Sequence, residues 1–192
     1  MQKSEAHKDL RVLRTRKLIQ QAFIDLTVEK GFAALTIQDI TERAMINRST
    51  FYRHYLDKYD LLDQLLNELD ALLDNRNTPD EPGPLRLLQH IEQFADFYRV
   101  MLGPQGDPSF VERFRQNTER HFRALFAQAR AASNEPPLDL KIASIAYAGV
   151  GATIWWLEQQ QPCSPEQLAT WMSQISSAIA GPELKPRSSK ER

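Results

Sequence analysis

Residues 47–55 carry hydroxyl, guanidinium and phenol groups at a spacing that would place them on one face of a helix. On a wheel of 3.6 residues per turn, Phe51 and Tyr55 fall on one side, and Ser49 and Arg53 fall on the other. If the two aromatic side chains are buried, the polar ones must face solvent. Arginine can bond both acceptors of a guanine, and serine or threonine hydroxyls are adaptable partners for base edges. The pattern therefore predicts that Ser49, Thr50 and Arg53 contact the bases of double-stranded DNA.

A second short helix is predicted directly before this one. Thr36 can cap its first amides, and the carboxylate of Asp39 can reach back to the amide of Thr36. Apolar residues then recur at helical spacing as far as Ala44, and Asn47 can cap the next helix only three residues later. Two helices joined by so tight a corner form a helix-turn-helix. The alternative is a solvated helix face, which similar polar residues produce in any soluble protein.

The segment INRSTFYRHYLDKYDLL resembles the recognition helix and the following helix of the TetR family of bacterial transcriptional regulators. The resemblance runs over residues 14–66 and includes RTRKLIQQAFIDLTVEKGF and LTIQDI. It implies an all-α protein, in which an amino-terminal three-helix DNA-binding module with the helix-turn-helix precedes a helical ligand-binding and dimerisation domain.

The resemblance also implies roles for single positions. Backbone phosphates are contacted in similar proteins by the residues that match Thr36, Tyr52, His54 and Lys58. The major groove is faced by those that match Arg48, Ser49, Thr50 and Arg53. For His54, a half-buried histidine satisfied by a neighbouring group stays open as an alternative to a phosphate contact.

The charge of the chain is unevenly distributed. Residues 1–58 hold eleven Lys and Arg against seven Asp and Glu, a net charge of +4, whereas residues 59–192 carry −5, which together give the overall −1. A basic amino-terminal part attracts the phosphate backbone, and an acidic remainder repels it. Arg14 belongs to the basic group near the start of the first helix, and we predict that it contacts DNA. The alternative is an ordinary soluble start of a helix.

The composition excludes several classes of protein. A lone cysteine, Cys163, cannot form an intramolecular disulfide, and the chain shows neither a secretory signal nor an apolar run expected to cross a bilayer. We therefore expect a cytoplasmic protein with no membrane partner. The four histidines are scattered and form no HExxH motif, so we expect no catalytic residue, metal site or cofactor. An enzyme whose active-site residues meet only in space stays open as an alternative.

Glycine, proline and capping residues mark the expected helix boundaries. The first helix should end before Gly31, and Asp57 should cap a leucine-rich helix. A loop is predicted over residues 75–84, and Ser164 with Pro165 should begin the last helix. Further helices are predicted over 85–102, 109–133 and 138–160, near eight in total. The predicted domains are 1–58 for DNA binding, 59–181 for effector binding and dimerisation, and 182–192 as a polar, disordered tail.

The second half is rich in aromatic residues that are candidates for lining an effector cavity or for an ordinary core. The candidates are Phe94, Phe97, Tyr98, Met101, Phe114, Phe122, Tyr147 and Trp156. Similar proteins dimerise through their last two helices, and a twofold pair of recognition helices reads a palindromic operator with half-sites about 34–36 Å apart. Dimer contacts are therefore predicted at Gly149, Thr153, Leu168, Trp171, Met172 and Ile175. Packing of these helices within one chain is the alternative to a homodimer.

By the same resemblance, a small-molecule effector binds the second half and releases the DNA. A protein coregulator that binds the second half in place of the effector stays open as a further alternative.

Overall fold

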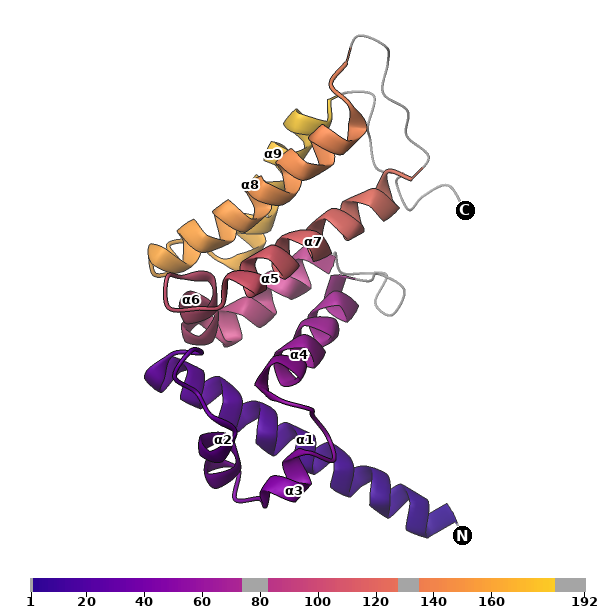
Figure 1. The fold of residues 1–192 in the computed structure, drawn as a ribbon. Coiled ribbons are helices and arrows are strands. Elements are labelled where there is room, and N and C mark those ends of the chain that lie inside the picture. Colours follow the sequence, from indigo (N-terminus) through magenta and orange to yellow (C-terminus); the bar gives the residue numbers. More distant parts are fainter. Residues whose placement is uncertain (1, 74–82, 128–134, 182–192) are drawn as a thin grey trace. The chain divides into compact units, whose positions relative to one another are not determined.

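The computed structural model describes residues 2–73, 83–127 and 135–181, and these ranges are helical without strands, which confirms the predicted all-α fold (Figure 1). The helices are α1 (Gln2–Lys30), α2 (Ile37–Arg43), α3 (Arg48–Phe51), α4 (Lys58–Leu73), α5 (Gly83–Gln93), α6 (Ala95–Leu102), α7 (Pro108–Leu125), α8 (Leu138–Glu158) and α9 (Pro165–Ala180).

These helices form two compact units. The first unit extends to Glu68 and takes in Asp96–Asp107, so it holds α1 to α3, most of α4, and α6. The second unit contains α5, α7, α8 and α9. The chain thus returns to the first unit after α5, whereas the sequence suggested a single division after residue 58.

The core of the first unit is aromatic. Phe23 on α1 meets Phe32 edge-on, with ring centroids 6.0 Å apart, and Phe97 on α6 at 5.9 Å. All three rings are at most 2% exposed. As predicted, α1 ends before Gly31, whose φ of +79° is a left-handed conformation that glycine adopts without strain.

Two predicted elements differ from the structure. The expected helix over 85–102 is divided at Phe94 into α5 and α6, which belong to different units and are separated by neither glycine nor proline. The predicted loop over 75–84 lies mostly outside the described residues, but Gly83 and Pro84 form the first turn of α5. The predicted tail, 182–192, also lies outside the described residues.

The second unit is built around α8. Ile142, Ile145 and Val150 are buried on this helix, which packs against α7 and α9. By length and composition α8 could cross a membrane, so the expectation that the chain has no such run was wrong. Its packing within the unit accounts for the apolar residues. As predicted, α9 begins after Ser164, whose hydroxyl accepts from the amide of Gln167 at 3.3 Å.

Candidate functional site

A capping box and an ion pair hold the start of α2 against the end of α1. The hydroxyl oxygen of Thr36 accepts from the amide of Asp39 at 3.2 Å, and Asp39 Oδ2 accepts from the amide of Thr36 at 2.9 Å, which confirms the predicted cap. Lys30 Nζ lies 2.6 Å from the same carboxylate oxygen. The hydrogen bond from Lys30, followed by those from Thr36, lowers the pKa of Asp39 to about 2. The carboxylate therefore stays charged and holds α2 against α1 at neutral pH.

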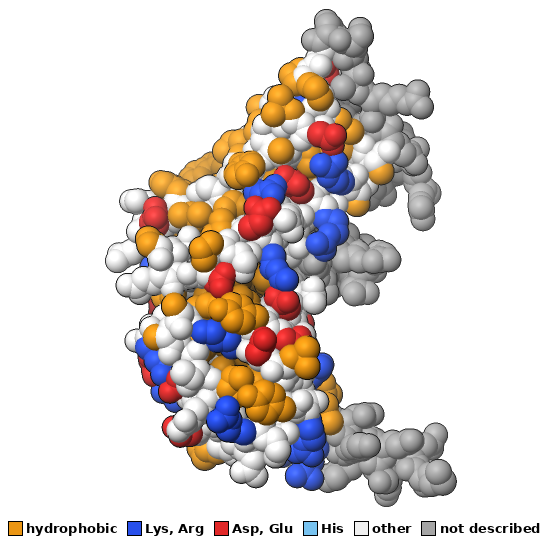
Figure 2. Space-filling view, viewed as in Figure 1, with side chains coloured by type: hydrophobic (Ala, Val, Ile, Leu, Met, Phe, Trp, Pro, Cys, Tyr) orange, Lys and Arg blue, Asp and Glu red, His pale blue; other side chains and the backbone are white. Residues whose placement is uncertain are grey.

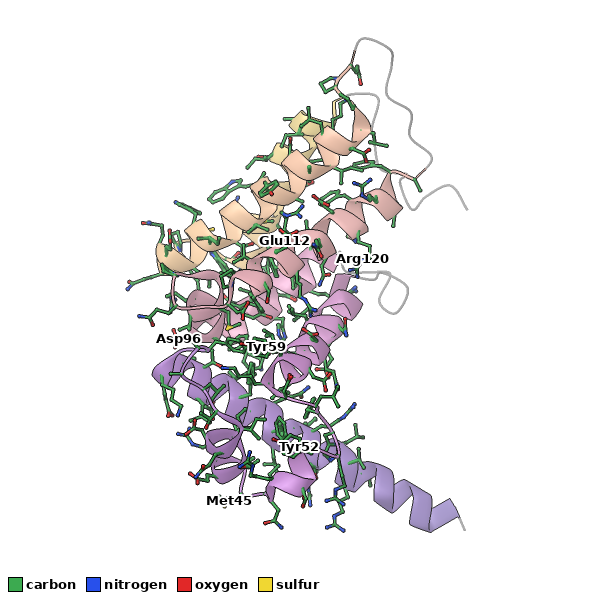
Figure 3. The ribbon with its side chains drawn as sticks, viewed as in Figure 1. Met45, Tyr52, Tyr59, Asp96, Glu112 and Arg120 are labelled. Carbon is green, nitrogen blue, oxygen red and sulfur yellow. The ribbon has the colours of Figure 1, made fainter. Side chains whose placement is uncertain are left out.

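The corner between α2 and α3 is closed by backbone hydrogen bonds. Met45 adopts a left-handed φ of +51°, and the amide of Ile46 donates to the carbonyl of Thr41 at 3.0 Å. Met45 lies at this corner and is 92% exposed (Figure 3). Asn47 begins α3 as predicted, but its side chain makes no capping hydrogen bond. Its carbonyl instead accepts from the amide of Thr50 at 2.8 Å.

Buried aromatic rings set the orientation of α3. Phe51 is fully buried and Tyr55 is 2% exposed, with ring centroids 5.7 Å apart. The α-helix itself ends at Phe51 and is four residues long, so it is shorter than predicted. The amides of His54 and Tyr55 still donate to the carbonyl of Phe51 at 2.9 and 3.0 Å. The chain therefore keeps its helical rotation through Tyr55, and the predicted burial is confirmed.

The opposite side of this segment presents a polar surface. Arg48, Ser49, Tyr52 and Arg53 are exposed, and Thr50 is half-buried. Arg53 Nη2 donates to the hydroxyl of Thr50 at 2.9 Å, and Arg48 Nη2 lies 3.5 Å from the hydroxyl of Tyr52. Each guanidinium group therefore has one hydrogen-bond partner on the neighbouring turn, and its other N–H donors stay available. The surface has the donors that base edges and phosphates require.

Lys58 occupies a different position from the one that its proposed phosphate contact requires. Its ammonium donates to the carbonyls of Phe32, Ala33 and Leu35 at 3.0, 3.2 and 3.0 Å. It also lies 4.7 Å from the centroid of the Phe32 ring. Because an ammonium has three hydrogens, these bonds use all of them. The structure therefore favours a structural role for Lys58, which closes the loop between α1 and α2, over a phosphate contact.

Arg14 and Thr36, which were also predicted to contact DNA, differ in how free their polar groups are. Arg14 is exposed on α1, whereas Arg16 donates to Gln64 Oε1 at 3.2 Å and so connects α1 with α4. The hydroxyl of Thr36 donates to Asp39 at 2.6 Å, which leaves its amide and hydroxyl both engaged with that side chain. Arg14 is therefore open to a phosphate, and Thr36 acts first as the cap of α2.

His54 is half-buried beside the polar surface. Burial lowers its pKa below the ordinary 6.5, and the positive charges of Arg16 and Arg53 lower it further. The unfolded chain then binds the proton more tightly than the folded one. The contribution of neutral His54 to the free energy of unfolding is therefore present above pH 6.5 and is lost as the pH falls through the pKa of the folded state.

We expect His54→Gln to reduce the loss of stability between about pH 7.5 and about pH 5.5. Urea unfolding of the parent and the variant at both pH values measures this loss of stability in each protein. The pKa of His90 is also lowered by burial, but His90 is common to both proteins and cancels in their difference. The DNA affinity of the same pair then decides the role of His54. A phosphate beside it would make affinity rise on acidification in the parent only, and equal profiles would mark a structural histidine.

The second unit contains a cavity of about 260 Å³ between α5, α7, α8 and α9. Of the eight predicted residues, Phe114 and Phe122 line it. The other six are placed elsewhere. Phe97, Tyr98 and Met101 are core residues of the first unit, and the ring of Phe94 lies 4.9 Å from that of His90. Trp156 is fully buried with its indole N–H on the carbonyl of Cys163, and Tyr147 is 62% exposed.

The predicted dimer residues divide between two sides of α8 and α9. Gly149, Thr153 and Met172 line the cavity, and Leu168 is buried. Trp171 and Ile175 are exposed, together with Trp155 of α8 and with Tyr147, which was predicted to line the cavity. Figure 2 shows hydrophobic side chains along α8 on the visible surface. The four exposed residues form what we call the apolar face: Tyr147, Trp155, Trp171 and Ile175.

No group of three or more His, Cys, Asp or Glu side chains suited to a metal occurs among the described residues.

Known proteins resemble this chain along most of its length. The model described as "Bacterial regulatory proteins, tetR family" matches residues 19–65, and that described as "Transcriptional regulator C-terminal region" matches residues 81–178. The regulator YxbF of Bacillus subtilis is 39% identical over 85 residues, which are 43% of this chain and 22% of YxbF. The activator DhaS of Lactococcus lactis is 32% identical over 89 residues, 44% of this chain and 47% of DhaS. The matches thus span less than half the length of these curated relatives.

Solved structures share the fold. A TetR transcriptional regulator from Streptococcus agalactiae superposes with a TM-score of 0.68 at 29% identity, covering 90% of this chain and 99% of that protein. NalD, a repressor of a multidrug efflux pump in Pseudomonas aeruginosa, gives a TM-score of 0.61 at 18% identity, covering 86% of this chain and 96% of NalD. With the helix-turn-helix and its exposed polar surface in place, these matches establish that the chain belongs to the TetR family of bacterial transcriptional regulators.

Proposed function

We propose that this chain is a cytoplasmic homodimeric repressor that binds a palindromic DNA operator and leaves it when a small molecule occupies the cavity of the second unit. The observation that supports this most strongly is the burial of Phe51 and Tyr55, which leaves Arg48, Ser49 and Arg53 exposed on one surface. NalD, which shares the fold, is described as a repressor.

The contacts can be assigned from the chemistry of the exposed groups. Arg53, Ser49, Thr50 and Arg48 contact base edges in the major groove, because their donors lie on the outer side of α3 and the turn after it. Backbone phosphates are contacted by a second group, Arg14, Tyr52 and His54, whereas the donors of Thr36 are used within the cap of α2.

The apolar face supplies the dimer contact. Trp155 and Trp171 are 44% and 40% exposed, and Tyr147 and Ile175 even more so. Aromatic residues are enriched at the buried centres of protein interfaces. A second copy that covers this face gives a twofold arrangement, and two α3 segments related in this way read half-sites about 34–36 Å apart.

Selection of bound duplexes from random DNA tests the proposal. The purified full chain should enrich a palindrome, and its affinity should fall steeply with salt because phosphate contacts release counterions. Sedimentation of the complex should give two protomers per palindrome. An absence of salt-sensitive binding to any duplex would overturn the proposal.

We expect Arg53→Ala to weaken operator binding and to relax the preference at one base pair, by about 1–3 kcal/mol for a bidentate contact to guanine. Titration of the operator and of all single-base variants at that position measures both effects. The control is Tyr52→Phe, which removes a hydroxyl assigned to a phosphate and should weaken all sequences alike. Equal losses on every sequence for Arg53→Ala would remove Arg53 from base recognition.

A second candidate is an activator that works with a protein coregulator, because DhaS is named an operon activator and the apolar face exposes aromatic residues of the kind that protein interfaces bury. Operator binding that does not respond to any occupant of the cavity would favour this alternative.

A further inference from the structure

The cavity of the second unit is lined on most sides by carbon. Phe114 and Phe122 of α7 face it, together with Leu88 of α5, Ile145 of α8 and Met172 of α9. Its volume of about 260 Å³ is a little below the ~300–1,000 Å³ that is usual for sites of drug-sized molecules. An occupant must therefore be small and largely apolar.

Charged groups are absent from this lining. Among the described residues that face the cavity there is no Lys, Arg, Asp or Glu, and the one titratable side chain is His121. Taking a charge out of water without an opposite charge or several hydrogen bonds is strongly unfavourable. The described part of the walls holds no Lys, Arg, Asp or Glu to pair with an ion, so an ionised ligand would lose its hydration without gaining an opposite charge.

The nearest buried cation is already neutralised. Lys141, 6% exposed, lies behind the end of the cavity at Ala180, to whose carbonyl its ammonium donates at 3.0 Å. Glu135 Oε2 lies 2.7 Å from the same nitrogen. An acidic ligand would have to displace Glu135 or share Lys141 with it, and either costs an existing ion pair.

Hydroxyl groups line one wall. Ser173, Ser176 and Ser177 lie on α9 at spacings of three and four residues, so they follow one side of the helix. The hydroxyls of Thr118 and Thr153 instead donate to carbonyls of their own helices, at 3.0 Å each. The serines can therefore bond an amine or carbonyl group at the edge of a ligand.

We infer that the effector is an uncharged aromatic molecule with a polar group at one edge, held between the phenylalanines of α7 and the serines of α9. This rests on the proposed effector-controlled function and adds the chemical class of the ligand. It excludes carboxylates and phosphate esters of the same size.

Two fluorescent probes that differ in one group test the charge. N-Phenyl-1-naphthylamine is neutral, and 8-anilino-1-naphthalenesulfonate is the same skeleton with a sulfonate. With the full chain, the neutral probe should saturate one site per protomer, and the sulfonate should bind there at least about tenfold more weakly, because its charge meets no partner. Equal or tighter binding of the sulfonate at this site would overturn the inference.

Substitutions at two glycines of α8 test whether the probe binds in the cavity. A Cβ on Gly149 would lie 3.6 Å from Met172 Cε and 3.9 Å from Thr118 Cγ2, inside the cavity, whereas one on Gly151 would have no described atom within 4 Å. Gly149→Leu should therefore weaken the neutral probe by about tenfold or more by filling the space, and Gly151→Leu should leave its affinity within about twofold. Ser176→Phe fills the same space from α9 and serves if Gly149→Leu loses its helical circular dichroism.

The outcomes separate the ligand class from the proposed function. Saturable binding of the neutral probe that Gly149→Leu abolishes supports the class, whether or not operator affinity changes; no change in operator affinity would count against the effector-controlled repressor alone. If neither probe binds while operator binding persists, the ligand class is overturned and the DNA-binding part of the proposal stands. If Gly151→Leu removes probe binding as strongly as Gly149→Leu, the cavity is not the site.

Discussion

Replacing Phe51 with alanine should lower the free energy of unfolding of the first unit by about 3–5 kcal/mol and abolish operator binding. The ring is fully buried and meets Tyr55 at 5.7 Å and Tyr52, edge-on, at 5.7 Å. Its removal leaves a cavity beneath the segment that presents Arg48, Ser49 and Arg53. Hydrogen exchange of the amides of α2 and α3 measures the local loss, and far-UV circular dichroism in urea measures the global one.

Two comparisons test whether the loss of stability is confined to the first unit and depends on the buried ring. All three tryptophans, Trp155, Trp156 and Trp171, lie in the second unit, so their fluorescence should hardly change at low urea. Tyr52→Ala removes an aromatic ring that is 48% exposed, and it should cost less than about 1 kcal/mol of stability while weakening DNA binding. Unchanged exchange rates in Phe51→Ala would show that this ring does not hold α3 in place.

Replacing Lys58 with methionine should cost about 2–3 kcal/mol of stability, because hydrogen bonds to a charged group are lost and three carbonyls of the loop between α1 and α2 lose their donor. The same nitrogen lies 4.7 and 5.6 Å from the ring centroids of Phe32 and Tyr59. Methionine has a similar unbranched side chain without the charge, so the change isolates the ammonium. Urea unfolding measures the loss. The salt dependence of operator binding, measured where both proteins are folded, should have the same slope as the parent.

Lys17→Met is the matched control, since Lys17 is an exposed lysine of α1 in the same unit. It should change stability by no more than about 0.5 kcal/mol. The opposite result for Lys58→Met, with stability intact and the salt slope reduced by about one, would return Lys58 to the phosphate contacts that the family resemblance implied.

Local signals in the sequence were sufficient for the helix-turn-helix. The capping box of Thr36 and Asp39, the end of α1 at Gly31 and the cap at Asp57 each depend on groups within four residues, and the structure contains all three. The burial of Phe51 and Tyr55 follows from helical periodicity in the same way. Lys58 could not be placed by such signals, because its carbonyl partners lie 23 to 26 residues earlier in the chain.

The second half was harder to predict because α8 has apolar or small residues around most of its circumference. Periodicity then identifies a helix but does not show which side faces inward. Gly149 and Thr153 were assigned to a dimer contact on their size, yet they line the cavity, and Tyr147 was assigned to the cavity although it is exposed. Which helix covers each side of α8 depends on α7 and α9, whose positions the spacing of residues in α8 does not encode.

The position of Gly149 and Gly151, two residues apart on opposite sides of α8, has an evolutionary consequence. One helix shapes the cavity with one side and the apolar face with the other. Under the proposed function, a substitution on α8 that changes ligand specificity lies on the same helix as the residues that select the partner subunit. After gene duplication, changes in the sensed ligand and in the choice of partner would therefore be coupled through this one helix.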